Sequence, residues 1–404
     1  MRVLYVVHQF FPKHYTGTER FTFDLCKQMQ KMGYQVDVLT YGIADDTGYD
    51  YTKNDFLIKE YEFDGVPVTS IRHKHMPEDV SFDIFMAEME EFLYELLPNY
   101  DLKHVFHPMR LGTAIKVAKK LNIPTILTLT DFWVICPMAQ LLTPNGKLCY
   151  GALEPQKCVK DCYGKLWADK LTRRFKEMKE LVRMVDHIIA PTYFLASMIK
   201  NVLDVHIPVI PYGLDYRFVN DIKKKSRDNL TLGFIGSVLP HKGVHILIAA
   251  IKLFDDTAVR VKIYGDYFHA VEYIHQLKNL ADNDERIEFT GKYDYSEISR
   301  ILSELDVAVV PSIWWENAPF TIQTSFAYKT PVIASNLGGM SEVVKDGVNG
   351  FLFEAGNAES LAEIIRRITK NPEILNRIGD NIVSPSRIEE VAFEYEKIYG
   401  KLKV

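Results

Sequence analysis

Short apolar runs alternate with helical stretches along almost the whole chain, and this alternation limits the possible folds more than any other feature. In the first half, apolar runs at Val3–Val7 and Val36–Leu39 flank a helical pattern over Arg20–Met32 that ends at Gly33. Continuous apolar runs of this length are typical of parallel strands that helices cover on both faces. The pattern therefore predicts an α/β fold built on doubly wound parallel sheets.

The rest of the first half follows the same rule. The expected elements are a hairpin over Lys59–Val68 around Asp64-Gly65, helices over Phe82–Leu97, Leu111–Leu121 and Lys165–Val185, a strand that starts at Val105, and strands over Pro124–Leu129 and His187–Ala190. Between Trp133 and Gly164 the periodicity gives way to a loop that contains cysteine, proline and glycine.

A second alternating unit begins after a polar run at Asp221–Asn229. Its expected strands, each followed by a helical pattern, are Thr231–Ile235, Val259–Tyr264, Ile287–Phe289, Val307–Val310 and Val332–Ala334. No strand follows the last helix, which covers about Ser386–Leu402. A chain of 404 residues with two such units is predicted to form two doubly wound α/β domains in series.

Charge and composition exclude several classes of protein. Lys and Arg number 48 against 53 Asp and Glu, a net charge of −5, so the chain is not a general nucleic-acid binder. No apolar run approaches the ~20 residues that span a bilayer. The opening Met1–Val7 run is followed at once by His8-Gln9, which is too polar for a signal peptide. These features predict a cytoplasmic enzyme, and five cysteines are too few for a disulfide framework.

Three loops of the second unit carry residues suited to an anionic ligand. The first is Gly233-Phe234-Ile235-Gly236-Ser237 with His241-Lys242-Gly243 before a helix, although its spacing fits neither a G-x-G-x-x-G nor a Walker loop. The alternative for this loop alone is a tight turn with a solvated lysine.

The second loop, from Pro311 to Phe320, contains Glu316-Asn317-Ala318-Pro319. Pro319 suits the first position of a helix, with Asn317 or Ala318 at the cap. Free backbone N–H groups there would meet a phosphate, and Glu316 would stand at the mouth to accept hydrogen bonds from sugar hydroxyls. The alternative is a solvent-exposed cap beside two packed tryptophans.

The third loop is Asn336-Leu337-Gly338-Gly339-Met340-Ser341-Glu342, after the Val332–Ala334 strand. Lys345-Asp346-Gly347-Val348-Asn349-Gly350 then has only the pattern of a turn. Because the carboxyl ends of parallel strands meet at one sheet edge, the three loops together predict a nucleotide-sugar site.

These motifs resemble the retaining family-4 glycosyltransferases of GT-B fold. The order G-x-x-G-S…K-G, P-S-x-x-x-E-N-x-P-F, P-V-I-A-S-x-x-G-G-x-x-E and D-G-x-N-G-F-L-F carries the resemblance from Gly233 to about Ile365. The first half is similar more loosely, with His8, Pro12 and Gly17-Thr18-Glu19 in the family's acceptor-side glycine loop.

The resemblance implies two facing Rossmann-like domains, with the last helix crossing back onto the first. The domains would be residues 1–208 with about 386–404, including the cysteine-bearing loop 133–164, and residues 209–385. The donor-binding residues implied are Gly17, Gly236, Ser237, Lys242, Gly265, Glu316, Asn317, Ala318, Pro319, Phe320, Thr321 and Thr324. Lysine and helix dipoles would stabilise the leaving group, so no divalent metal or other cofactor is expected for catalysis.

Three positions depart from the family pattern. The second glutamate of the family's pair would fall at 324, where this chain has Thr324. An arginine often follows the first glycine turn, at the position of Ser237, and the family's His-Asp pair is here Thr130-Asp131.

In a retaining transfer without an enzymic nucleophile, positioning and electrostatics carry catalysis. The expected catalytic residues are Glu316 and Lys242 on the donor side and Asp131 and His107 on the acceptor side.

Four of the five cysteines lie within 27 residues, in the spacing C-x12-C-x8-C-x3-C. They are Cys136, Cys149, Cys158 and Cys162. Four thiolates suit a structural Zn²⁺ or an iron–sulfur cluster. The spacing lacks paired C-x2-C motifs, so reduced thiols are the next interpretation and a disulfide the last.

The helix over Lys165–Arg183 is basic and amphipathic. Such a helix can lie on anionic lipid, which would suit peripheral contact with the inner face of a membrane and a lipid-linked acceptor. Its acidic residues Asp169, Glu177 and Glu180 dilute the charge, so a helix packed on its own sheet is the favoured interpretation.

The sequence thus predicts a retaining glycosyltransferase that moves a hexose-type sugar from a UDP- or GDP-type donor to a glycan or lipid-linked acceptor. The product would enter polysaccharide or glycoconjugate synthesis. The alternatives are a nucleotide-sugar epimerase-hydrolase of the same two-domain shape and a non-catalytic nucleotide-sugar-binding protein.

Overall fold

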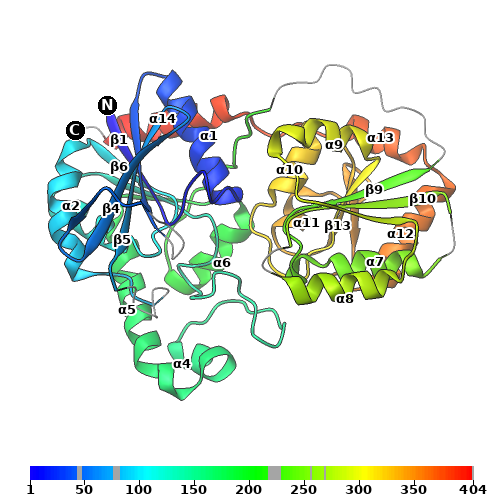
Figure 1. Cartoon of the computed structure of the whole chain (residues 1–404), viewed down its shortest axis with the longest axis horizontal. Helices are drawn as coiled ribbons and strands as arrows, with labels where there is room; N and C mark the ends of the chain where they lie inside the picture. The colour runs from blue at the N-terminus through cyan, green and yellow to red at the C-terminus, as the bar shows by residue number, and fades with distance from the viewer. Residues whose placement is uncertain (43–47, 76–81, 217–228, 255–256, 268–269, 403–404) are drawn as a thin grey trace. The chain divides into compact units, whose positions relative to one another are not determined.

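The chain forms two compact units (Figure 1). The computed structural model describes residues 1–42, 48–75, 82–216, 229–254, 257–267 and 270–402. Met1–Asp215 and Ser386–Val404 make up the first unit, and Tyr216–Pro385 makes up the second. The polar run predicted at Asp221–Asn229 lies outside the described residues except for Asn229.

Among the described residues, the first unit contains an eight-stranded sheet in the order β3-β4-β5-β2-β1-β6-β7-β8. Its strands are β1 (Arg2–Val7), β2 (Gln35–Tyr41), β3 (Tyr51–Lys53), β4 (Phe56–Phe63), β5 (Val66–His73), β6 (Leu102–Val105), β7 (Thr125–Thr128) and β8 (His187–Ile189). Strands β1, β2, β5, β6, β7 and β8 run parallel, as the apolar runs predict. The hairpin at Asp64-Gly65 is confirmed, because Phe63 pairs with Val66 across an antiparallel β4–β5 ladder.

Helices cover both faces of this sheet (Figure 1). The described helices of this unit are α1 (Gly17–Lys31), α2 (Glu90–Leu96), α3 (Gly112–Lys120), α4 (Pro155–Cys158), α5 (Ala168–Met184), α6 (Tyr193–Leu203) and α14 (Ile388–Leu402), of which α4 packs against α5 away from the sheet. The C-terminal helix α14 packs beside α1, although most of the sequence separates them. The hydroxyl of Tyr399 on α14 lies 2.6 Å from Nδ1 of His104 and 3.2 Å from the Tyr5 hydroxyl, in the buried centre of the sheet. The last helix is therefore part of the first unit's core.

The described part of the second unit contains a six-stranded parallel sheet in the order β11-β10-β9-β12-β13-β14. The strands are β9 (Leu230–Ile235), β10 (Val259–Tyr264), β11 (Ile287–Gly291), β12 (Val307–Val310), β13 (Val332–Ser335) and β14 (Gly350–Phe353). The helices are α7 (Val244–Lys252), α8 (Val271–Ala281), α9 (Ile298–Glu304), α10 (Phe320–Ala327), α11 (Gly339–Val343), α12 (Ala358–Lys370) and α13 (Ile374–Asn381). Residues of α7, α8 and α12 pack in one core, and those of α9, α10 and α11 pack in two others (Figure 1).

Two elements of the first unit differ from the prediction. The strand expected to start at Val105 ends there, because Lys103 and His104 are buried strand residues whose polarity disguises β6. The Lys103 ammonium donates to the carbonyls of Leu97 and Tyr100, at 2.8 Å each. The helix expected over Phe82–Leu97 begins only near Ala87, since the Met86 N–H bonds the Thr113 hydroxyl instead of a helical carbonyl.

Other segments also contain more structure than the sequence predicts. The loop 133–164 includes α4 and a π-helical turn over Val159–Tyr163. The turn before Gly350 leads into β14, which the sequence analysis missed. A Cβ at Gly350 would lie 2.6 Å from the Val332 carbonyl oxygen, so glycine allows this strand to approach β13.

Candidate active site

Most of the residues predicted for donor binding lie where the strand order of the second sheet reverses. Strands β10 and β11 lie on one side of β9, and β12, β13 and β14 lie on the other. Gly236 and Ser237 follow β9 directly, and the Pro311–Phe320 loop follows β12. The carboxyl ends of the two strands at such a reversal leave a crevice in which α/β sheets bind ligands.

Lys242 and Glu316 form the centre of this donor-side group. The Lys242 ammonium lies 2.7 Å from Oε1 of Glu316, and the Ser312 hydroxyl and Trp314 indole N–H donate to the same oxygen at 2.7 and 2.8 Å. Within the described residues, Oε2 of Glu316 receives no hydrogen bond. One carboxylate oxygen therefore fixes the side chain.

The ionisation of this pair follows from its surroundings. Burial raises the pKa of Glu316, but the Lys242 charge and the three hydrogen bonds outweigh burial and hold that pKa below its ordinary value. Glu316 is only 6% exposed, so it is buried rather than at an open mouth as predicted. Burial and the Lys242 charge lower the pKa of the neighbouring His241 to about 4, which keeps that ring neutral at pH 7.

Glycines allow the loops of this group to approach one another. A Cβ at Gly243 would lie 1.9 Å from the Pro311 carbonyl oxygen, and one at Gly265 would lie 1.8 Å from that of Gly236. Gly243 also has φ +75°, in the left-handed region that favours glycine. The predicted residue Gly265, just after β10, therefore serves the packing of the loop that contains Gly236.

The loop after β12 leads into the start of α10. Pro319 was predicted as the first helical residue, but it is the N-cap, and the helix begins one residue later, at Phe320. The Asn317 side chain accepts a 2.6 Å hydrogen bond from the Ala318 N–H, and the Gly339 N–H bonds the Glu316 carbonyl at 2.7 Å. Helix α10 begins at Phe320, four residues after Glu316, so its first N–H groups follow this loop directly.

Two threonines and one serine complete the predicted donor residues. Thr321 and Thr324 lie three positions apart on one face of α10, and the Thr321 hydroxyl donates to the Ile235 carbonyl at 3.0 Å. Thr324 is buried, whereas Ser237 is exposed. Gly17, predicted for the same ligand, is the first residue of α1 in the other unit.

The residues predicted for the acceptor side lie at the corresponding reversal of the first sheet, between β1 and β6. His8 follows β1 and His107 follows β6, and their ring centroids are 4.0 Å apart. Asp131 follows β7, with its Oδ2 atom 2.9 Å from Nε2 of His107. The structure therefore brings together the two residues that the sequence selected on this side.

Hydrogen bonds define which nitrogen of His107 carries the proton. The Met109 N–H points to Nδ1 at 3.3 Å, so Nδ1 accepts and Nε2 donates to Asp131. Asp131 also accepts the Trp133 N–H on Oδ1 at 2.7 Å, which orients the carboxylate. Thr130, where the family pattern has histidine, turns its hydroxyl to the Phe106 carbonyl at 3.1 Å. The ring that faces Asp131 comes from His107 instead.

Several other polar residues lie around this pair; the sequence placed His8 and Glu19 in a glycine loop on this side but selected neither as a catalytic residue. The buried side-chain atoms without a hydrogen-bond partner in the described part of the chain include four from these residues, namely His8 Nδ1, Glu19 Oε1, Arg110 Nε and Trp133 Nε1. Glu19 is fully buried and its Oε1 lies 3.9 Å from Nε2 of His8. Burial and the neighbouring charges lower the pKa of His8, so the ring is neutral. Unsatisfied buried polar atoms are rare in folded proteins. In the sequence, the Gly17-Thr18-Glu19 segment after β1 was the signal for polar residues at this place.

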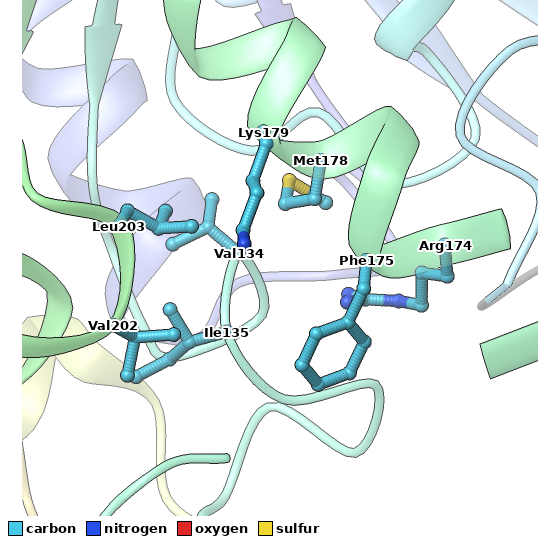
Figure 2. A pocket seen from close by; sticks show the side chains of 8 residues that line it. All are labelled: Val134, Ile135, Arg174, Phe175, Met178, Lys179, Val202 and Leu203. Atoms are coloured by element: carbon cyan, nitrogen blue, oxygen red, sulfur yellow. The ribbon is translucent and has the colours of Figure 1, made fainter. Parts of the chain in front are cut away.

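The cysteine-bearing loop lies next to the acceptor-side pair in the chain and ends at α5. None of its four cysteines forms a disulfide, and each is partly exposed. Figure 2 shows a nearby crevice between α5 and α6, lined by Val134, Ile135, Arg174 and Leu203 among others. Its volume is about 10 Å³, room for one water molecule, so it does not hold a sugar. The basic helix predicted over Lys165–Arg183 is α5, which packs against α3 and α4.

The comparisons with known proteins identify the class. A model of Glycosyltransferase Family 4 matches residues 15–218, and a model of glycosyl transferases group 1 matches residues 216–383. The chain therefore belongs to the glycosyltransferases that these two models describe, Family 4 in its first half and group 1 in its second. Its two Rossmann-like units are those of the GT-B fold. Members of the group generally need no cofactor. Among the described residues, no helix is both long and apolar enough to span a membrane.

Individual relatives agree with this assignment. An uncharacterised glycosyltransferase of Methanocaldococcus jannaschii is 34% identical over 46% of this chain and 52% of its own length. The O-antigen chain mannosyltransferase C of Escherichia coli is 24% identical over 97% of this chain and 94% of its own. The crystal structure of Anabaena HepE in complex with UDP superposes with a TM-score of 0.71 at 17% identity, covering 99% and 100% of the two chains. The chain is thus a transferase of the kind that builds polysaccharides and glycoconjugates.

Proposed function

We propose that this glycosyltransferase moves a hexose-type sugar from a nucleoside-diphosphate sugar to a glycan or lipid-linked acceptor with retention of the anomeric configuration. The observation that carries the proposal is the Lys242–Glu316 pair at the strand reversal of the second sheet. A cation, a buried carboxylate with one oxygen remaining and a helix start together match a phosphate that bears a sugar.

The donor would bind the second unit. Its diphosphate would meet Lys242, the Gly236-Ser237 backbone and the start of α10, while Oε2 of Glu316 would accept a sugar hydroxyl. Helix N-termini favour anions, because their first N–H groups lack acceptors within the helix. The UDP bound by HepE, a protein of the same fold, supports a nucleoside diphosphate as the ligand class.

The acceptor hydroxyl would meet the His107–Asp131 pair. In the reaction, the bond from the anomeric carbon to the phosphate oxygen breaks and the bond to the acceptor oxygen forms on the same face. The acceptor proton passes to the departing phosphate, and Lys242 stabilises the negative charge that develops there. Asp131, oriented by the Trp133 N–H and by His107, would position the hydroxyl without becoming a nucleophile.

A turnover assay tests this proposal. The protein is incubated with UDP-, GDP- and ADP-sugars, with and without glycan and lipid-linked acceptors, and the released nucleoside diphosphate and glycosylated product are measured by mass spectrometry. Proton NMR of the product gives its anomeric configuration. We expect release that depends on the acceptor, with the donor's configuration kept. Release without any acceptor would identify an epimerase-hydrolase, and nucleotide binding without release would identify a binding protein; either result contradicts the proposal.

A further inference from the structure

Arg110 has an unusual backbone conformation close to the His107–Asp131 pair. It lies three residues after His107, in the loop between β6 and α3, and its φ is +66°. This left-handed conformation is strained for a residue with a long side chain, and glycine or asparagine would relieve the strain. Strained residues of this kind persist where the direction of a side chain serves a site. The conformation of Arg110 therefore asks what its side chain binds.

The guanidinium of Arg110 has no counter-charge among the described residues. Its Nε atom is buried without a hydrogen-bond partner, and its cation lies 5.3 Å from the centre of the Tyr41 ring. Burial lowers the pKa of Arg110, and no carboxylate opposes this effect. Arg174 shows the usual solution for a buried arginine, because it donates to the Trp133 carbonyl. A charge that is half-buried and unpaired is costly, so Arg110 is suited to a partner from outside the chain.

The order of strands places this guanidinium beside the proposed acceptor side. Tyr41 ends β2 and, by the parallel register of β1 with β2, lies next to His8. The His8 ring lies 4.0 Å from that of His107, and the charge of Arg110 contributes to the low pKa of His8. Strands β2 and β7, which end near Arg110 and Asp131, are three spacings apart, on the order of 14 Å.

The two carboxylates at this edge of the sheet have other partners. Glu19 accepts a 2.6 Å hydrogen bond from the Thr16 hydroxyl, and its second oxygen lies 3.9 Å from Nε2 of His8. Asp131 accepts hydrogen bonds on both oxygens. Neither carboxylate forms an ion pair with Arg110 in the part of the chain that the structure describes. The positive charge of Arg110 is therefore not neutralised by the acids nearest to it in the sheet.

We propose that Arg110 binds an anionic group of the acceptor, a carboxylate or a phosphate ester, while the reacting hydroxyl of the same acceptor meets Asp131. The planar guanidinium donates two parallel N–H bonds to such an oxyanion, which a lysine does not. The separation along the sheet edge means that the anion and the reacting hydroxyl belong to different parts of the acceptor. This inference rests on the proposed function, because it assumes that the first unit binds the acceptor. Arg110 then determines specificity for acidic acceptors.

Binding of matched sugars tests the inference without turnover. The probes are methyl glucoside, methyl glucuronide and methyl glucoside 6-phosphate, which differ only at C6, and they are titrated into full-length protein labelled with ¹⁵N-arginine. We expect one anionic probe to bind at least ~10-fold more tightly than the neutral one and to shift the Nε–H signal of Arg110. The probe that binds more tightly identifies carboxylate or phosphate as the group. Equal binding of all three probes, or no shift of the Arg110 signal at millimolar concentration, overturns the inference.

Variants assign the preference to this side chain. Arg110→Gln removes the charge at the same backbone conformation and should lose the preference for the anionic probe, whereas Arg110→Lys should keep a part of it. Arg183→Gln, at an exposed arginine of α5, is the matched control and should behave as wild type. A preference that survives Arg110→Gln overturns the inference.

Unfolding separates binding from a purely structural role. Because Arg110 has no counter-charge to leave behind, Arg110→Gln should unfold at the same denaturant concentration as wild type or at a higher one. A clear loss of stability with unchanged binding of the probes would show a structural arginine and overturn the inference.

Kinetics distinguish this inference from the proposed function. With an acceptor that supports transfer, Arg110→Gln should raise the acceptor KM at least ~10-fold, change kcat less and leave the dissociation constant of the nucleotide unchanged. An unchanged acceptor KM, or a loss of nucleotide affinity instead, overturns the role of Arg110 and leaves the transferase intact. A protein that binds the anionic probe through Arg110 but transfers no sugar would support the anion site and contradict the proposed function alone.

Discussion

Nε2 of His107 lies 2.9 Å from Oδ2 of Asp131, and the Met109 N–H occupies the other ring nitrogen. The ring is therefore a donor toward Asp131 and holds the carboxylate from one side, while the Trp133 N–H holds it from the other. This arrangement orients Asp131 at the proposed acceptor side even though Thr130 stands where the family pattern has histidine.

The first prediction concerns this pair. His107→Ala removes one of the two groups that orient Asp131, so we expect kcat to fall by roughly 10²-fold. The dissociation constant of the nucleotide should not change, because Lys242, Glu316 and the start of α10, the proposed phosphate and sugar contacts, belong to the second unit. Steady-state kinetics and calorimetric titration measure the two quantities. His206→Ala, at an exposed histidine of the same unit, should match wild type. Equal losses in kcat and nucleotide affinity would contradict the assignment.

The second prediction concerns Lys242. Lys242→Ala leaves Glu316 buried with two hydrogen bonds instead of three and without its opposing charge. We expect a loss of roughly 1–3 kcal/mol in unfolding free energy at pH 7. Denaturant unfolding measures it, with Lys252→Ala, at an exposed lysine of α7, as the control.

The pH dependence of the Lys242→Ala loss has a definite sign. The pKa of Glu316 is lowered in the folded wild type, so its ionised form contributes stability above its unfolded value, and this contribution disappears as pH falls through the folded pKa. The difference between wild type and Lys242→Ala should therefore shrink below about pH 4. A difference that stays constant down to pH 3 would show that the Glu316 charge plays no part.

The third prediction concerns Asp24 in α1. Burial raises its pKa to about 7, and the like charge of Asp215 adds to this despite Arg20 at 3.9 Å. Between its unfolded value near 4 and pH 7, the folded chain holds a proton that the unfolded chain releases, so Asp24 reduces stability as pH rises. Asp24→Asn should then be stabilising by about 1–3 kcal/mol at pH 8 and nearly neutral at pH 4. Denaturant unfolding at both pH values measures this, and equal effects at pH 4 and 8 would contradict it.

The fourth prediction concerns Gly243. Gly243→Ala places a Cβ 1.9 Å from the Pro311 carbonyl oxygen at φ +75°, so the loops that hold Lys242 and Glu316 must separate. We expect a loss above ~2 kcal/mol and weaker nucleotide binding. Gly347→Ala is a matched control, because Gly347 has φ +69° and open space where its Cβ would go. That control should cost only the backbone strain of about 1 kcal/mol. Similar losses for both would show that the close approach does not matter.

The sequence predicts strands well where they are purely apolar. Val3–Val7 and Val307–Val310 are buried on both faces, so their composition identifies them. Strand β6 contains the buried polar residues Lys103 and His104. Lys103 bonds a preceding turn and His104 bonds the C-terminal helix. The pattern of residues within β6 does not contain that information. The strand prediction therefore failed at β6, where hydrogen bonds to other segments stabilise buried polar residues within the strand.

For the site, the motif residues were predictable and their neighbours were not. The glycine turns and the Glu316 loop are local signals at strand ends. The resemblance placed His8 and Glu19 on the acceptor side, but the contact of His8 with His107 follows only from the pairing of β1 with β6 in the sheet. The burial of Glu316 was not predictable either, because Ser312, Trp314 and Lys242 enclose it through the folded loop.

Nucleotide binding at the Lys242–Glu316 pair is the central claim, and a thermal-shift panel tests it most directly. UDP, GDP, ADP and their sugars are each added at millimolar concentration to wild type, Lys242→Ala and Lys252→Ala. A ligand at 100 times its dissociation constant adds ~2.7 kcal/mol of stability. The account predicts that one nucleoside-diphosphate series raises the melting temperature of wild type and Lys252→Ala but not of Lys242→Ala. If no nucleotide shifts the wild type, or if the shift survives in Lys242→Ala, the donor site is not where this pair lies.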